Sequence, residues 1–129
     1  CGKCQKCLDA CPTKAITEPF VVNSNLCLAY HTLENRESKL PKHISKSLNP
    51  WIAGCDICQE VCPWNQKKQT TTKDPDMQPQ DWIHTLTSKE ILTWDEETWK
   101  QKLNGSTLKR IKPWMWRRNA KAMEDEYDC

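Results

Sequence analysis

Eight of the nine cysteines of this 129-residue chain lie within its first 65 positions, in two runs that end alike. Residues 1–12 have the pattern C-x2-C-x2-C-x3-C-P, and residues 55–63 have the pattern C-x2-C-x3-C-P. Three thiolates spaced by two residues can surround one corner of an iron–sulfur cubane, and the proline after the last cysteine turns the chain away from it. This spacing constrains the first half of the chain more than any other feature.

Bacterial-type ferredoxins use this spacing, and in them the cysteine before proline binds the other cluster of a pair. The pattern therefore predicts two 4Fe–4S clusters with crossed ligands. The ligands predicted for the first cluster are Cys1, Cys4, Cys7 and Cys62. The ligands predicted for the second cluster are Cys11, Cys27, Cys55 and Cys58. Cys27 enters the second set because the two motifs leave it unassigned.

The main alternative for eight cysteines is a pair of zinc sites with four thiolates each. Zinc ribbons usually separate their C-x2-C pairs by longer spacers and lack both the third close cysteine and the proline endings. Clustered C-x2-C motifs also argue against disulfides and for the reducing cytoplasm, where we expect this chain to be. Cys129 follows the mainly acidic residues 124–128, and we expect it to be an exposed thiol without a function.

We expect an α+β fold, in which residues 1–65 form a bacterial ferredoxin-like domain with two clusters, mostly helical and with little strand. Residues 66–80 are polar and nearly free of apolar side chains, which predicts a linker or surface loop. Residues 81–129 are predicted to form a short, helical, basic appendage. No stretch approaches the roughly 18–20 apolar residues that a membrane span needs, so we expect no membrane partner.

Three helices are expected in the appendage. The first should begin near Asp95, because Thr93 and Glu96 have the spacing of a capping box. Two more are expected over residues 106–112 and 114–124, on either side of a proline.

Most tryptophans are expected to pack in the core, and two of the histidines are expected to be solvent-exposed without a functional role. Five tryptophans are predicted to be packing residues: Trp51, Trp64, Trp82, Trp94 and Trp99. The three histidines share no metal-ligand spacing, and we expect His43 and His84 to be solvated at the surface.

Three segments of the first half resemble the epoxyqueuosine reductase family. They are residues 1–16 (CGKCQKCLDACPTKAI), 27–34 (CLAYHTLE) and 54–65 (GCDICQEVCPWN). The tail resembles the same family at residues 94–97, 108–110 and 117–120, so the resemblance covers nearly the whole chain. It implies a cobalamin-dependent oxidoreductase with two 4Fe–4S clusters that reduces epoxyqueuosine to queuosine at the wobble position of tRNA. It also implies the same crossed ligand set, with Cys27 on the second cluster.

In that family a large domain before the first cysteine holds most of the cobalamin site and the proton donor. We therefore expect this chain to be the carboxyl-terminal, cluster-bearing part of such an enzyme, with no catalytic residue and no activity of its own. The residues expected on the cobalamin side are Tyr30, Thr32, Asp56 and Gln59. Ala29 and His31 depart from the family pattern in this segment.

Residues 100–121 contain eight Lys or Arg and no acidic residue, with Trp114 and Trp116 among them. Such a run is more often a solvated helix face, but together with the resemblance it predicts contact with tRNA. Cations suit the phosphate backbone, and aromatic faces suit unstacked anticodon bases. The residues expected to bind tRNA are Lys109, Arg110, Lys112, Arg117 and Arg118.

The partners expected are tRNA at its anticodon region, cobalamin and a separate electron donor, with the chain acting as a monomer. Two rival functions stay open at this point. One is a free-standing ferredoxin-like electron carrier with two 4Fe–4S clusters and a helical tail. The other is a nucleic-acid-binding module whose clusters are purely structural.

Overall fold

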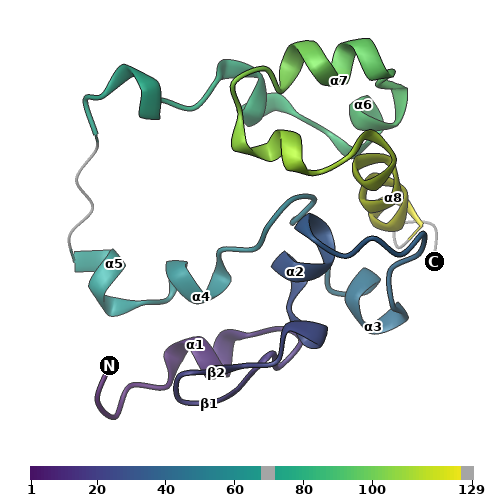
Figure 1. Cartoon of the computed structure of the whole chain (residues 1–129). Coiled ribbons are helices and arrows are strands. Elements are labelled where there is room, and N and C mark those ends of the chain that lie inside the picture. Colours follow the sequence, from purple (N-terminus) through teal and green to yellow (C-terminus); the bar gives the residue numbers. More distant parts are fainter. Residues whose placement is uncertain (68–71, 126–129) are drawn as a thin grey trace.

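The computed structural model describes residues 1–67 and 72–125 of the chain. The cysteine-rich half is built from short helices and one hairpin (Figure 1). Its elements are α1 (Lys6–Ala10), β1 (Ile16–Glu18), β2 (Val21–Val22), a 3-10 helix (Ser24–Leu26), α2 (Leu28–Leu33), α3 (Lys42–Ser45), α4 (Ile57–Glu60) and α5 (Pro63–Lys67). The expectation of a mostly helical domain with little strand is confirmed.

The hairpin is the whole of the sheet within the described residues. β1 and β2 are antiparallel, with Ile16 opposite Val22 and Glu18 opposite Val21 and an irregular register between them. Phe20 lies in the turn with a φ of 69°, a left-handed conformation that strains any residue with a Cβ.

The C-terminal half is helical. Its elements are 3-10 helices at Pro75–Met77, Asp81–Thr85 and Thr107–Arg110, together with α6 (Ser88–Thr93), α7 (Glu96–Lys102) and α8 (Pro113–Glu124). Among the described residues, no helix is long and apolar enough to span a membrane.

The start of α7 agrees with the prediction, but its cap is different. Asp95 is the N-cap and its carboxylate accepts a hydrogen bond from the Thr98 amide at 2.8 Å. Thr93 is instead the last residue of α6, so the expected capping box between Thr93 and Glu96 is wrong. The physical reason is that Asp95 offers a better acceptor directly before the helix.

The other two helical predictions are also modified by the structure. The stretch expected over residues 106–112 is a single 3-10 turn, Thr107–Arg110, capped by the Ser106 hydroxyl. Pro113 does not separate this turn from a helix at 114, because Pro113 is itself the first residue of α8. Proline suits that position, where its missing N–H would have had no helical partner.

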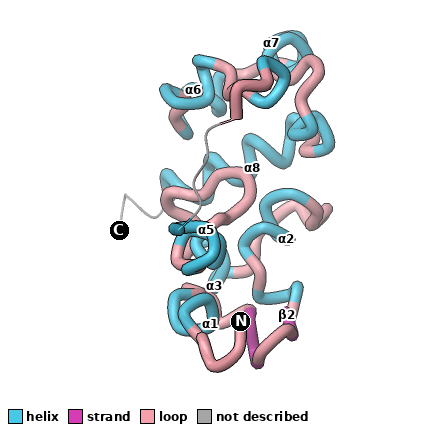
Figure 2. The backbone as a smooth tube through the Cα atoms, turned by 90° about the vertical axis from the view of Figure 1, so that its left-hand side faces the viewer, coloured by secondary structure: helices cyan, strands magenta, loops and turns pink. Residues whose placement is uncertain are grey.

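Two buried apolar clusters form the core, and α8 contributes to both. The larger cluster joins α6, α7 and α8 through Ile91, Trp94, Trp99, Leu103, Ile111, Met115, Trp116 and Ala120. The smaller cluster joins α2, α3 and α8 through Leu28, Ile44, Leu48 and Met123. α8 therefore lies between the C-terminal helices and the cysteine-rich half, as Figure 2 also shows. The domain boundaries at 65 and 80 stay a prediction, and packing crosses them.

A packing role is predicted for five of the seven tryptophans, and the structure shows where each of them lies. Trp94 and Trp99 are buried, and Trp82 packs against the larger cluster, as expected. Trp51 is half-buried, but Trp64 is 68% exposed, so its assignment to the core is wrong. Trp64 follows Cys62-Pro63 at the surface, where no apolar layer covers it.

Candidate metal centre

Most of the eight cysteines of the first half lie in or beside short helices, whereas Cys1 and Cys4 lie in the irregular segment before α1. Cys7 is in α1 and Cys11 is its C-cap, Cys27 is the N-cap of α2, and Cys58 is in α4. Cys55 follows Gly54, whose φ of 86° allows the chain to turn there. All eight are free thiols that are exposed or half-buried. Cys129 lies outside the described residues.

One cavity of about 550 Å³ opens between the two cysteine motifs. Its sulfur-bearing walls are Cys1, Cys4, Cys7, Cys58 and Cys62. Ile16, Val22, Pro63 and Trp64 form its apolar walls, and Lys6, Gln59 and Lys67 complete the lining.

A second cavity, of about 170 Å³, is lined by four cysteines: Cys11, Cys27, Cys55 and Cys58. The rest of its lining is almost wholly apolar, with Ala15, Leu28 and Ile57 among its walls. Ile16, Val22 and Cys58 line both cavities, so the two spaces adjoin.

The thiols around the smaller cavity influence one another. Burial raises the pKa of the Cys55 thiol, against a hydrogen bond from the Ile57 amide. Charges on three neighbouring thiols raise the same pKa further: Cys58, Cys27 and Cys11. Packing four thiolates together is therefore unfavourable unless a positive group lies among them.

Hydrogen bonds favour the thiolate form of Cys11. Burial opposes its ionisation, but hydrogen bonds from the Ala15 and Ile16 amides and from Thr13 hold the pKa of Cys11 below its ordinary value. The Ala15 amide nitrogen lies 3.2 Å from the Cys11 sulfur. Amide bonds to sulfur are one way in which proteins orient a cluster ligand and tune its potential.

The donor set fits a polynuclear iron–sulfur group. Among the described residues no three His, Cys, Asp or Glu side chains meet closely enough to hold a single metal ion. Each set of sulfurs instead surrounds a space with apolar walls. Thiolates around such a space are the ligands that 4Fe–4S clusters require.

The four residues predicted on the cobalamin side have different environments. Tyr30 is 37% exposed, and Asp56 and Gln59 are exposed. Gln59 lies beside the larger cavity and accepts a hydrogen bond from Asn65 at 3.0 Å. Thr32 is fully buried, so its side chain cannot contact a ligand outside this chain. Its hydroxyl donates to the Leu28 carbonyl at 2.9 Å and accepts from the Gly54 amide at 2.9 Å.

The residues predicted to bind tRNA also differ in their environments: some have exposed, unpaired side chains and others already bond to the protein. Lys109 and Lys112 are exposed, and within the described part of the chain neither side-chain amine has a hydrogen-bond or ion-pair partner. Arg110 forms an ion pair with Glu34, and Arg117 donates to the Trp94 carbonyl at 2.8 Å.

Arg118 has an internal role that the sequence did not indicate. Its guanidinium donates to the backbone oxygens of His31, Asn35 and Glu37. Burial and the nearby charge of Arg36 lower the pKa of Arg118. The ring of Trp114 lies 5.5 Å from the Arg118 guanidinium carbon.

Trp116 and His31 are also buried. Trp116 is 2% exposed, so the expectation that its ring offers a face to RNA bases is wrong; it is part of the larger core cluster. His31 is 5% exposed and its two ring nitrogens contact the Asn25 carbonyl and the Asn35 amide, at 2.8 and 2.9 Å. His43 and His84 are exposed, as expected.

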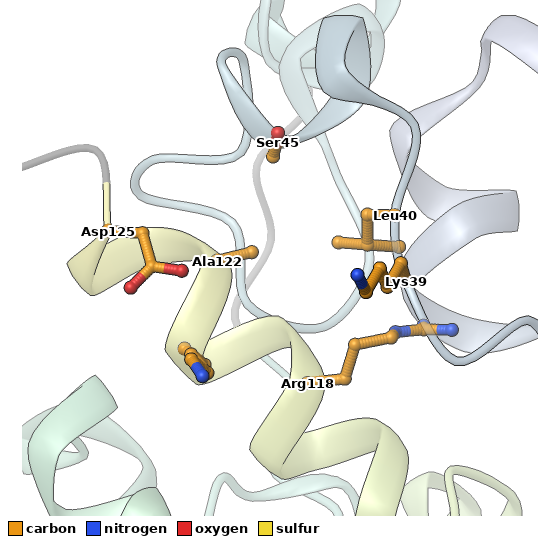
Figure 3. A pocket seen from close by; sticks show the side chains of 7 residues that line it. Lys39, Leu40, Ser45, Arg118, Ala122 and Asp125 are labelled. Carbon is orange, nitrogen blue, oxygen red and sulfur yellow. The ribbon is translucent and has the colours of Figure 1, made fainter.

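A basic cavity of about 410 Å³ lies beside α8 and shares no lining residue with the two cysteine-lined cavities. Figure 3 shows Arg118, Ala122 and Asp125 along α8 and Lys39, Leu40 and Ser45 across from them. Lys121 completes the lining. The sequence prediction missed Lys39 and Lys121 as neighbours, because they are far apart in the chain.

Comparison with known proteins identifies the cysteine-rich half. Residues 1–65 match the protein family described as 4Fe-4S double cluster binding domain. The chain is 62% identical over 119 residues to an epoxyqueuosine reductase of Prochlorococcus marinus (strain NATL2A), which covers 92% of this chain and 38% of the relative. It is 39% identical to the epoxyqueuosine reductase of Escherichia coli (strain K12), over 92% of this chain and 31% of that protein. The chain thus spans well under half the length of these relatives.

Solved structures of epoxyqueuosine reductases have the same fold. A selenomethionine-labelled form superposes with a TM-score of 0.88 at 31% identity, over 98% of this chain and 33% of the other. A complex of epoxyqueuosine reductase with an epoxyqueuosine-modified tRNA-Tyr stem loop superposes with a TM-score of 0.82 at 32% identity, over the same shares.

Proposed function

The chain belongs to the family of 4Fe-4S double cluster binding domains, and we propose that it is the iron–sulfur part of an epoxyqueuosine reductase. The observation that carries the proposal is the division of the eight cysteines between two adjoining cavities. The 62% identity to a curated epoxyqueuosine reductase supports the same function. In this role the chain would pass electrons toward cobalamin for reduction of epoxyqueuosine to queuosine in tRNA.

The ligands of the first cluster would be Cys1, Cys4, Cys7 and Cys62, and those of the second Cys11, Cys27, Cys55 and Cys58. The linings of the two cavities support this allocation. Cys58 lines both, and its place in α4 between Cys55 and Cys62 is what brings the two spaces together. Clusters bound in these two cavities would therefore lie close together, so electrons would have only a short distance to travel between them.

When bound, the clusters and cobalamin would supply the low-potential electrons that removal of an epoxide oxygen requires. The chain's own residues prepare the site for them. The Ala15 amide stabilises the Cys11 thiolate, and the apolar walls of the smaller cavity would keep part of the solvent away from its half-buried ligands. Low solvent exposure and amide bonds to sulfur are among the factors that set a cluster's potential.

On the cobalamin side, Tyr30, Asp56 and Gln59 are the exposed candidates, and Thr32 would act only by holding Gly54 in place. On the RNA side, Lys109 and Lys112 have free amines for phosphate, whereas Arg110, Arg117 and Arg118 already have protein partners. If these three arginines bind tRNA, each would have to share its present protein partner with a phosphate or give it up. Binding of a tRNA stem loop by a structural relative supports this role for the basic half.

In this function the chain would form two units, a ferredoxin-like domain and a helical basic appendage, joined around residues 66–80. It would work in the cytoplasm as a monomer that receives electrons from a separate donor. Eight unpaired thiols suit such a reducing compartment.

Crossed ligation gives a sharp test. The anaerobically purified protein should contain about eight irons and eight labile sulfides, with an EPR spectrum of two interacting cubanes after dithionite reduction. Cys11→Ser should impair the second cluster although Cys11 lies in the first motif, and Cys62→Ser should impair the first. Zinc in place of iron, or loss of the first cluster in Cys11→Ser, would contradict the proposed ligand set.

A second measurement separates the enzyme from a free-standing electron carrier. Reduction of cobalamin by the reduced clusters in the whole-length protein, followed by conversion of epoxyqueuosine in a tRNA stem loop, would support the enzyme. Reversible reduction without either reaction would favour the ferredoxin-like carrier.

A further inference from the structure

A buried amide from α8 joins the two segments that lead to Cys27 and Cys55. Asn119 is fully buried, and its Nδ2 donates to the carbonyl oxygens of Thr32 and Ile52, both at 3.0 Å. Thr32 belongs to α2, which begins directly after Cys27. Ile52 lies three residues before Cys55.

The orientation of this amide is fixed by its neighbours. Both N–H groups face carbonyl oxygens, which only accept hydrogen bonds. The Asn119 Oδ1 faces Nε and Nη2 of Arg118 at 3.1 and 2.9 Å, and these atoms only donate. A flipped amide would place oxygen against two carbonyls and nitrogen against a guanidinium, so only one orientation satisfies all four contacts.

A second hydrogen bond links Thr32 to the backbone beside Cys55. The buried Thr32 hydroxyl accepts from the Gly54 amide at 2.9 Å, next to Cys55. Thr32 thus receives the Asn119 bond at its carbonyl and holds Gly54 at its side chain. Packing reinforces the link, because Cys55 and Ile52 lie against the smaller core cluster that Leu28 and Met123 form.

We infer that Asn119 is a positioning residue for the second cluster, fixing the spacing of the Cys27 and Cys55 backbones through Thr32 and Ile52. The inference rests on the proposed ligand set for that cluster. It also assigns to α8, which lies outside the matched residues 1–65, a part in building the site. Within the described residues the Asn119 side chain bonds only to Arg118, Thr32 and Ile52, so the first cluster should be unaffected.

Asn119→Asp is the direct test, because it keeps the shape of the side chain and replaces both N–H donors by a carboxylate oxygen. Thr32→Val removes the hydroxyl from the other end of the link, and Thr32→Ser keeps it. Asn104→Asp is the matched control, since Asn104 is exposed. Met123→Ala is the stability control, because it weakens the same core cluster without touching the amide.

Iron per chain, EPR of the reduced protein and the thermal midpoint are measured for each purified variant. Asn119→Asp and Thr32→Val should fall from about eight irons to about four, and the spectrum of two coupled cubanes should become that of one. Thr32→Ser, Asn104→Asp and Met123→Ala should keep about eight irons.

Two results would overturn this inference and leave the proposed ligand set intact. One is a full iron content and coupled spectrum in both Asn119→Asp and Thr32→Val. The other is an equal loss of iron in Met123→Ala at a matching thermal midpoint, which would show a general effect of stability. A wild-type protein with fewer than two clusters would overturn the ligand set and the inference with it.

Discussion

Arg118 donates a hydrogen bond from Nη2 to the backbone oxygen of His31 at 2.8 Å, across 87 positions of the sequence. Its Nη1 donates to the carbonyls of Asn35 and Glu37, at 2.8 and 2.6 Å. These acceptors lie in the last turn of α2 and just beyond it, where helical carbonyls have no partner within the helix. The guanidinium therefore caps α2 from α8.

Arg118→Ala should lower the free energy of unfolding by about 2–4 kcal/mol, because it leaves several carbonyls without a partner in a half-buried place. Arg118→Lys should recover only part of the loss, since one ammonium cannot reproduce the planar fork. Urea unfolding monitored by circular dichroism would measure both. Lys121→Ala, at an exposed position of the same helix, should change stability by less than about 0.5 kcal/mol. A loss in Arg118→Ala as small as the one expected for Lys121→Ala would contradict the capping role.

Lys109 and Lys112 provide a cleaner test of RNA binding than Arg118, because their removal does not disturb the core. Lys109→Glu together with Lys112→Glu should weaken binding of a tRNA stem loop and reduce the salt slope by about 1–2 units, since about 0.7–0.9 unit belongs to each phosphate contact. Fluorescence anisotropy at several salt concentrations would measure affinity and slope.

The matched control changes the same charge elsewhere. Lys73 and Lys89 are exposed and lie outside residues 100–121. Lys73→Glu together with Lys89→Glu should alter affinity through net charge alone and leave the salt slope close to that of the wild type. An equal slope in both double variants would exclude Lys109 and Lys112 as phosphate ligands.

Asp95 makes the stability of α7 depend on pH in the acid range. Hydrogen bonds from Thr98 hold the pKa of Asp95 below its ordinary value of 3.8. The folded state therefore binds this proton less readily than the unfolded state. The stabilisation is fully present above pH 3.8 and is lost as pH falls through the lower pKa of the folded state.

Thermal unfolding of the wild type and Asp95→Asn at several pH values above and below 3.8 would test this sign. Asn keeps an N-cap acceptor without the charge, so the two proteins should differ at the upper end and converge at the lower end. A difference that is constant across the range would show that the carboxylate charge contributes nothing.

The sequence predicted most where the determining information is local. The spacing within residues 1–12 and 55–63, with Cys27 added as the remaining cysteine, predicts two ligand sets. These sets stay a prediction, and the linings of the two cavities agree with them, with Cys58 also lining the larger cavity. The start of α7 near Asp95 was also predicted from neighbouring residues, although the predicted cap, Thr93, is wrong and Asp95 caps the helix.

Long-range contacts were beyond such reasoning. A basic run near the C-terminus predicts solvated cations, but Arg118 is used internally because α8 packs against α2. The cations around Trp116 predict a contact with RNA, yet the helical period of α8 places Trp116 in the core with Met115 and Ala120. Which face of α8 is buried depends on packing against α2, α3 and α6, and no local pattern contains these partners.

The buried tryptophans offer a direct measure of one hydrogen bond. Trp99 donates from Nε1 to the Ile111 carbonyl at 3.1 Å, whereas the Nε1 atoms of Trp94 and Trp116 have no partner among the described residues. Replacing any of the three by Phe removes similar apolar area and one N–H group. Trp99→Phe also leaves a buried carbonyl without its donor, whereas Trp94→Phe and Trp116→Phe remove a donor that was already unsatisfied.

Trp99→Phe should therefore lower the free energy of unfolding by about 1–3 kcal/mol more than either of the other two replacements. Urea titrations with a common slope would give the three values, and the slope itself shows whether the unfolded states are comparable. Equal losses in all three variants would mean that the Trp99 bond contributes no more than packing does. A larger loss in Trp116→Phe than in Trp99→Phe would contradict this expectation. It would mean that the Trp116 indole N–H donates to a partner such as a buried water.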